Sequence, residues 1–130
     1  MQNRYAADTM DLILYLEKRK LSKTVTNIFS EVENGNIELI IPSMAVAELA
    51  YLAERNRIDT NLTEVRKLLT AFKNVKIESL KFEIIEAAFQ IKNIPELHDR
   101  LIAATALTCK ATLVTNDPFI QASGSVKIIW

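Results

Sequence analysis

Short apolar segments alternate along this chain with longer segments in which apolar residues recur at helical spacing. The apolar segments predict strands over residues 5–8, 37–41, 75–77, 111–115 and 126–129. The periodic segments predict helices over residues 10–18, 22–33, 42–52, 61–72, 81–92 and 99–109. Strands that alternate with helices are typical of a parallel sheet covered on both faces. We therefore expect an α/β fold, with a central, mostly parallel sheet flanked by helices on both faces, formed by residues 1–130 as one domain.

Composition is that of a globular chain. Of the 130 residues, 49% are apolar and 25% are charged, with two glycines and three prolines, which excludes collagen-like, low-complexity and disordered classes. A chain of this length buries about 68% of its unfolded surface, so it needs no disulfides. Lys and Arg number 16, as do Asp and Glu, so nucleic acid has to be bound through local clusters. The candidates are Lys18-Arg19-Lys20 with Lys23, Arg55 with Arg57, and Arg66-Lys67.

The sequence contains one cysteine, Cys109, and one histidine, His98. The common zinc sites need more such ligands, so a bound metal would be a hard cation held by oxygen atoms. A lone cysteine also suits a reducing compartment, and we expect the protein to be cytoplasmic. No apolar run reaches the roughly 20 residues that span a bilayer, and acidic residues interrupt the apolar stretch that a signal peptide would need. We expect no membrane association and no secretion.

Four carboxylates occupy positions that the predicted fold would bring together. Asp8 ends the first strand, and Asp117 follows the strand over 111–115. Glu48 lies in a helix that is apolar on nearly every face, and Asp99 begins the last predicted helix. Loops at the carboxyl ends of parallel strands line the ligand crevice of such sheets. Acids that converge there repel one another when no cation is bound, and Mg²⁺ or Mn²⁺ would neutralise them.

Each of these acids also has a local interpretation. Asp8 and Asp99 suit the first turn of a helix, and for Asp8 capping and metal binding can coexist. Asp117 suits the polar turn Asn116-Asp117-Pro118. Glu48 would instead pair with an arginine such as Arg100, or lie at an exposed edge of its helix. The lone His98 is a candidate general acid, although a structural or solvent-facing role is more common for such a histidine.

Four stretches of the chain, taken together and in order, resemble the PIN-domain nucleases, particularly the VapC-like toxins of bacterial and archaeal toxin-antitoxin pairs. They are YAADT at 5–9, IPSMAVAEL at 41–49, HDRLIAATA at 98–106 and LVTND at 113–117. The resemblance covers almost the whole chain. It departs from the family at Met10, where relatives often have His, and in the loop over 94–98, which is shorter than in some of them.

The resemblance implies a PIN fold, an endoribonuclease activity on RNA that depends on Mg²⁺ or Mn²⁺, inhibition by a small cognate antitoxin, and a homodimer. Residues Asp8, Glu48, Asp99 and Asp117 match the acidic quartet of the family, and Thr115 matches its small hydroxyl position. The three aspartates would coordinate metal, and Glu48 would either coordinate metal or orient the attacking water.

Two further residues are candidates for supporting roles. Asn116 would bond to a metal-bound water or the scissile phosphate, or else cap the turn. Arg100 would grip a phosphate or neutralise a neighbouring acid. Apolar residues also fill the helix over 10–18 more completely than one buried stripe requires, which indicates either core packing or a surface for an antitoxin helix or a second subunit.

Two other classes of enzyme fit less well, and one non-enzymatic class keeps the fold. A phosphoryl-accepting receiver domain needs an aspartate at the end of a middle strand, and the segments after 37–41 and 75–77 have none there. A haloacid-dehalogenase-like phosphatase needs two aspartates with a single residue between them at the first strand, whereas two residues, Thr9 and Met10, lie between Asp8 and Asp11. A catalytically silent binding or scaffold module would keep the fold without the chemistry, but all four acids are retained.

Overall fold

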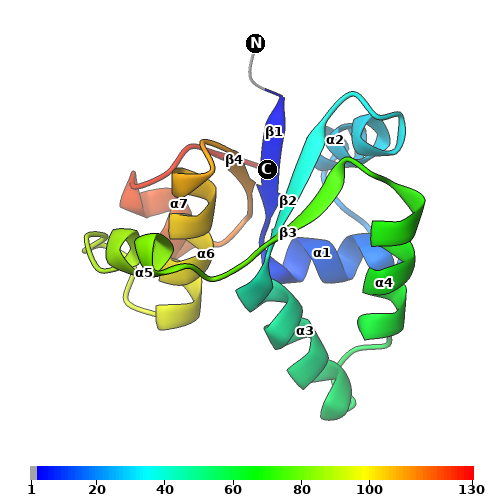
Figure 1. Cartoon of the computed structure of the whole chain (residues 1–130), viewed down its shortest axis with the longest axis horizontal. Helices are drawn as coiled ribbons and strands as arrows, with labels where there is room; N and C mark the ends of the chain where they lie inside the picture. Colours follow the sequence, from blue (N-terminus) through cyan, green and yellow to red (C-terminus); the bar gives the residue numbers. More distant parts are fainter. Residues whose placement is uncertain (1–2) are drawn as a thin grey trace.

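A computed structural model of the chain describes residues 3–130, in which five strands alternate with seven helices (Figure 1). The strands are β1 (Arg4–Ala7), β2 (Glu38–Pro42), β3 (Val75–Glu78), β4 (Thr112–Val114) and β5 (Ile128–Ile129). The helices are α1 (Thr9–Leu16), α2 (Lys23–Glu33), α3 (Ser43–Glu54), α4 (Leu62–Ala71), α5 (Phe82–Ala88), α6 (Leu97–Thr108) and α7 (Pro118–Ser123). No helix in this described part is long and apolar enough to cross a membrane.

The strands form one sheet in the order β3-β2-β1-β4-β5, and every neighbouring pair is parallel. The predicted α/β class and parallel sheet are confirmed. β1 lies at the centre, and its last residue, Ala7, pairs with Val114 at the end of β4. The residues that follow these two strands, Asp8 and Thr115, therefore leave the sheet side by side.

Helices cover both faces of the sheet, with α1, α2 and α4 on one side and α5, α6 and α7 on the other (Figure 1). Because side chains alternate along a strand, neighbouring strand residues enter different cores. Ala6 and Ile40 pack with buried residues of α5 and α6, whereas Ala7 and Ile41 pack with buried residues of α1, α2 and α4. This two-sided burial explains why the strand segments are almost continuously apolar.

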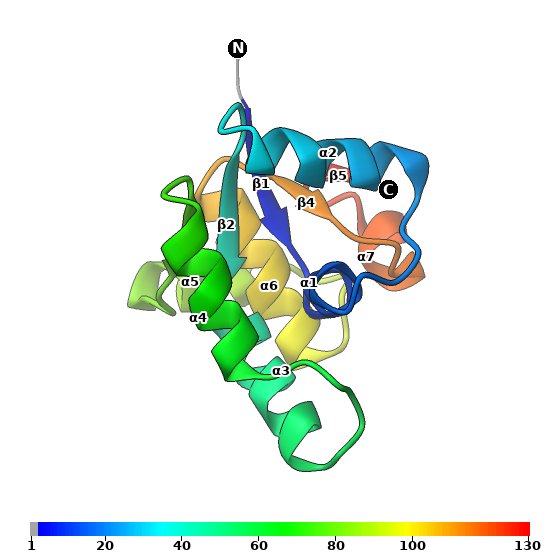
Figure 2. The same ribbon diagram turned by 90° about the vertical axis from the view of Figure 1, so that its right-hand side faces the viewer.

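Helix α3 begins directly at the carboxyl end of β2, where Pro42 fixes the backbone entry into the first turn. Its buried residues, Ala45 and Leu49, belong to the two separate cores. The C-terminal part of α3 and the connection to α4 project away from the sheet (Figure 2). One face of α3 therefore lies beside the edge of the sheet at which the strands end.

Most predicted elements are present with ends shifted by one or two residues, among them the helix expected over 10–18, which ends at Leu16, and the strand expected over 126–129, which begins at Ile128. Three further differences are larger or have a clear physical cause. The helix expected over 81–92 ends at Ala88, because Ile91 and Ile94 anchor an irregular segment in the core instead of continuing the helix. The helix expected from Asp99 begins at Leu97, because Glu96 caps it. Where only a polar turn was predicted, Asp117 caps the additional helix α7.

Candidate active site

Asp8 and Thr115 meet in the buried region beyond the ends of β1 and β4. Asp8 caps α1, because its Oδ1 accepts a hydrogen bond of 2.9 Å from the backbone N–H of Asp11. Its Oδ2 accepts a hydrogen bond from the Thr115 hydroxyl. The same hydroxyl oxygen accepts a 3.1 Å hydrogen bond from the backbone N–H of Asp117. Thr115 thus joins two of the predicted acids, and the capping interpretation of Asp8 is confirmed.

Asp117 lies at the start of α7. Its Oδ1 accepts hydrogen bonds from the backbone N–H groups of Phe119, at 2.8 Å, and Ile120, at 3.2 Å. These bonds make Asp117 the N-cap of α7, with Pro118 in the first turn. The neighbouring Asn116 is exposed, between the buried Thr115 and this cap.

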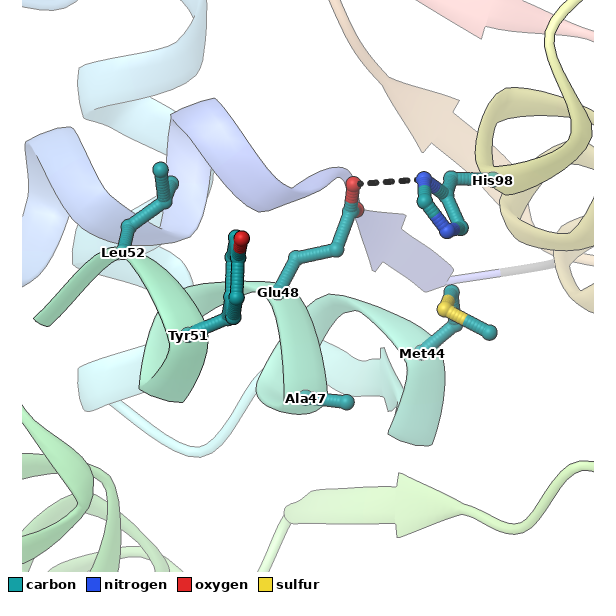
Figure 3. A pocket seen from close by; sticks show the side chains of 6 residues that line it. All are labelled: Met44, Ala47, Glu48, Tyr51, Leu52 and His98. Carbon is teal, nitrogen blue, oxygen red and sulfur yellow. Dashed lines mark ion pairs between the residues drawn. The ribbon is translucent and has the colours of Figure 1, made fainter. Parts of the chain in front are cut away.

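Glu48 projects from α3 toward the end of β1 and toward His98 at the start of α6 (Figure 3). Its Oε1 accepts a 2.5 Å hydrogen bond from the Thr9 hydroxyl, and its Oε2 lies 3.3 Å from His98 Nδ1. The side chain is partly exposed, at 28%. The polar contacts of this carboxylate are therefore a hydroxyl and an imidazole rather than the Arg100 guanidinium.

Arg100 directs its guanidinium toward the connection between α5 and α6. Its Nη2 donates a 3.3 Å hydrogen bond to the Pro95 carbonyl oxygen. Its guanidinium carbon lies 5.3 Å from the centre of the Phe89 ring, a cation–π distance. These contacts engage Arg100 away from Glu48.

Asp99 lies in the first turn of α6, and the acids around it affect its ionisation. Burial, followed by the charges of Asp117, Glu96, Glu48 and Asp8, raises the pKa of Asp99 to about 6. Contacts give the same placement, because Thr115 links Asp8 to Asp117 and Glu48 contacts both Thr9, next to Asp8, and His98, next to Asp99. The structure therefore brings the four acids predicted from the sequence into one region at the carboxyl ends of β1 and β4.

Three polar residues of this region were not assigned roles from the sequence. Thr9 donates its hydroxyl proton to Glu48, and Glu96 caps α6 through a 2.9 Å bond from the Asp99 N–H. Asp11 is fully buried, and within the described residues neither of its carboxyl oxygens has a hydrogen-bond partner. Burial, followed by the adjacent Asp8, raises the pKa of Asp11 well above its usual range. The sequence does place Asp11 three residues after the capping residue Asp8, but this spacing suggests a capping box and does not indicate that Asp11 is buried.

The donor set suits a hard divalent cation in its chemistry, since it consists of carboxylate and hydroxyl oxygens. It also suits one in its charge, because the pKa of Asp99 is raised first by burial and then by four neighbouring carboxylates, whose charge a cation would offset. Within residues 3–130, however, no three His, Cys, Asp or Glu side chains lie close enough around one point to hold an ion as they stand. A cation would therefore have to draw the carboxylates together.

A groove of about 560 Å³ opens beside Glu48. It is lined by Met44, Ala47, Glu48, Tyr51, Leu52 and His98, which come from one face of α3 and the start of α6 (Figure 3). The Glu48 carboxylate and the His98 imidazole form its polar end. The acidic region thus continues into a mainly apolar surface.

Residues 5–122 match the family model described as PIN domain, and the chain belongs to this family. The match includes all four acids of the site as well as Thr9, Thr115 and His98. No curated protein matches the sequence.

The fold is also similar to that of chains in solved complexes. VapBC2 from Rickettsia felis, bound to a DNA fragment of its promoter, matches with a TM-score of 0.72 and 20% identity over 98% of both chains. DNA-bound VapBC from Salmonella typhimurium matches with a TM-score of 0.69 and 18% identity, covering 99% of this chain and 98% of that one. FitAcB from Neisseria gonorrhoeae matches with a TM-score of 0.70 and 18% identity over 97% and 96%.

Proposed function

We propose that this PIN-domain protein is an endoribonuclease that depends on Mg²⁺ or Mn²⁺. The observation that carries the proposal is geometric: Thr115 links Asp8 to the backbone of Asp117, and the Glu48 carboxylate lies between Thr9, next to Asp8, and His98, next to Asp99. The pKa of Asp99 is raised first by burial and then by the charges of Asp117, Glu96, Glu48 and Asp8, which agrees with this placement. A region that concentrates negative charge in this way favours binding of a divalent cation. Membership of the PIN family, together with the likeness to VapC-like chains, supports nuclease chemistry at these acids.

In this proposal Asp8, Asp99 and Asp117 would hold the metal, and Glu48 would hold it or orient the attacking water. A divalent cation at this place supplies charge neutralisation at the phosphate and a more acidic water. Thr115 positions the Asp8 carboxylate through its hydroxyl, and it fixes the backbone of Asp117. Asn116, exposed beside them, is available to bond to the scissile phosphate.

We also propose that a cognate antitoxin protein inhibits this activity in the cytoplasm. Solved structures with similar folds include a toxin-antitoxin complex from Klebsiella pneumoniae and the VapBC and FitAB complexes. Their chains and this one cover more than nine tenths of each other's length. Copurification of the chain with the product of an adjacent short gene, and loss of cleavage in that complex, would test the proposal.

A homodimer is a further part of the proposal, and exposed apolar residues around the connection between β3 and α5 support it. Ile77 and Leu80 are exposed, and Phe82 is 69% exposed. Large apolar side chains grouped at a surface commonly mark an interface. Sedimentation should show a dimer for the wild type and a monomer for Phe82→Ser. A monomeric wild type, or an unchanged dimer in the variant, would contradict this surface.

A catalytically silent binding module is the second candidate. It is favoured by the hydrogen bonds that engage both Asp8 oxygens and by the absence, within residues 3–130, of three acid or imidazole side chains gathered closely enough for a metal. In that case the acids serve only as helix caps and hydrogen-bond acceptors. The two candidates differ in whether carboxylate charge is needed.

Cleavage of a structured RNA by the purified chain tests the proposal. The wild type should cleave with Mg²⁺ or Mn²⁺ and stop when EDTA is added, whereas Asp8→Asn and Asp99→Asn should be inactive. Asparagine keeps the capping ability of Asp8, so loss of activity reports the charge rather than the fold. Asp59→Asn, an exposed position, is the matched control and should cleave normally. Equal cleavage by wild type and both site variants would exclude these acids as the active site.

A further inference from the structure

One face of α3 lies between the two cores, and only Met44 and Leu52 on it pack partly against them. Its residues Met44, Ala47, Glu48, Tyr51, Leu52 and Arg55 recur at helical spacing. The buried positions of the helix, Ala45 and Leu49, lie off this face. All but Arg55 line the groove beside the acids, and His98 completes its lining. Core packing thus explains Met44 and Leu52, but it does not explain why Tyr51 and Arg55 are exposed on the same helical stripe.

The stripe changes in character along the helix. Glu48, next to His98, forms the acidic end that belongs to the candidate active site. Tyr51 is 56% exposed in the middle of the stripe. Arg55 forms the basic end: its Nη1 donates a 3.3 Å hydrogen bond to the Tyr51 hydroxyl, and its guanidinium carbon lies 5.5 Å from the centre of the ring. Arg55, the C-cap of α3, lies seven positions after Glu48, which corresponds to a rise of about 10 Å along a helix.

We propose that this groove is a subsite for one unpaired nucleotide of the RNA, with its base against Tyr51 and a flanking phosphate at Arg55. The inference rests on the proposed ribonuclease function. Aromatic side chains bind single-stranded bases by stacking, which any base can provide. A local arginine is also needed, because a chain with 16 basic and 16 acidic residues has no net field to hold a phosphate backbone. Binding here would place the adjoining phosphodiester at the acids beside Glu48.

The chemistry of the groove favours a nucleotide over a second protein copy. A protein surface packed on the stripe would cover Glu48 and His98 together with the apolar residues. Glu48 and His98 contact each other, but removing an ionisable pair from water costs free energy even when its members are in contact. A nucleotide instead matches each part of the groove, since its base suits the apolar centre and its phosphates suit Arg55 and a metal at the acids.

Binding of a fluorescently labelled single-stranded RNA, measured by anisotropy in EDTA, separates affinity from cleavage. Loss of one stacked base corresponds to a rise in Kd of roughly 5- to 150-fold, which we expect for Tyr51→Ala. Tyr51→Phe keeps the ring and should bind within about twofold of the wild type. Arg55→Ala should weaken binding and reduce its dependence on salt by about one phosphate contact. Lys127→Ala, an exposed basic residue outside the groove and outside the candidate basic clusters, is the control and should bind like the wild type.

Equal Kd values for Tyr51→Ala and wild type would overturn the inference, as would no RNA binding by the wild type. A Tyr51→Ala variant that sediments as a smaller species would assign the groove to a second copy and also overturn it. The proposed function fails separately. If the wild type binds RNA through Tyr51 but never cleaves it, the subsite stands and the ribonuclease function is excluded. If Tyr51→Ala cleaves RNA normally, the ribonuclease function stands and the subsite is excluded.

Discussion

At the scale of single residues, Thr115 holds the acidic site together. Its hydroxyl donates to Asp8, 107 positions earlier in the chain, and accepts from the N–H of Asp117. The sequence predicted a small hydroxyl near the last acid but not these partners. A hydrogen bond between residues so far apart depends on strand order, which no local pattern contains.

Replacing this hydroxyl tests its role. Thr115→Val keeps the shape of the buried side chain but leaves an Asp8 oxygen and the Asp117 N–H without their partner. We expect a loss of about 1–3 kcal/mol of folding free energy, measured by urea denaturation, and weaker cleavage. Thr115→Ser retains the hydroxyl and should remain near the wild type in both. Wild-type stability in the valine variant would contradict the role given to the hydroxyl.

The ionisation of Asp99 gives a prediction on pH. Burial and the neighbouring acids raise the pKa of Asp99 to about 6 from 3.8. Between these two pKa values, Asp99 is ionised in the unfolded chain but still protonated in the metal-free folded protein. The free energy of unfolding therefore falls as pH rises through this range, and the loss is constant above pH 6. In EDTA, Asp99→Asn should therefore have a higher melting temperature than the wild type at pH 7, and this difference in melting temperature should vanish toward pH 3.8. Parallel melting curves of the two proteins across this range would show that Asp99 carries no such penalty.

At the scale of elements, Glu17 fastens the α3–α4 connection to the end of α1. Its Oε2 accepts hydrogen bonds from the backbone N–H groups of Asp59, at 2.6 Å, and Thr60, at 3.0 Å. Burial alone would raise the pKa of Glu17, but these bonds and the nearby Arg19 hold that pKa below its usual range. The connection that follows α3 is thus anchored by one carboxylate.

Glu17→Ala should release this anchor and lower the free energy of unfolding by about 1.5–3 kcal/mol at pH 7. Because the folded pKa of Glu17 is lowered, its contribution is present above the unfolded value of 4.5 and is lost as pH falls through the folded value. Hydrogen exchange of the Asp59 and Thr60 amides should quicken in the variant. Glu86→Ala, on an exposed position of α5, serves as the control. Unchanged exchange at both amides would contradict the anchor.

Helix α7 was not predicted from the local sequence pattern. The Asp117-Pro118 pair was predicted to be a turn, but the aspartate caps a helix that Gly124 ends in a left-handed conformation, at φ 68°. Both signals are typical of helix ends, yet only six residues lie between them. With one buried residue, Ile120, this helix has too little periodicity to be recognised before its packing is known.

At the scale of the whole molecule, the parallel sheet is what creates the site. Its alternating strands and helices, and the acids at the strand ends, were predictable because burial on both faces leaves a simple apolar pattern. The partners of Glu48 were not predictable, since Thr9 and His98 reach it only after α1, α3 and α6 pack around the end of β1. Arg100, which the alternative interpretation of Glu48 offered as an ion-pair partner, turns instead toward Phe89.

Calorimetric titration of the purified chain with Mn²⁺ tests the central claim most directly, because it requires neither the natural RNA nor the antitoxin. We expect the wild type to bind Mn²⁺ at neutral pH and Asp99→Asn and Asp117→Asn to lose this binding. Asparagine retains the capping bonds of Asp117, so the variant tests its charge. A wild type that binds no Mn²⁺, or variants that bind it as tightly, would contradict the claim that these acids form one cation site.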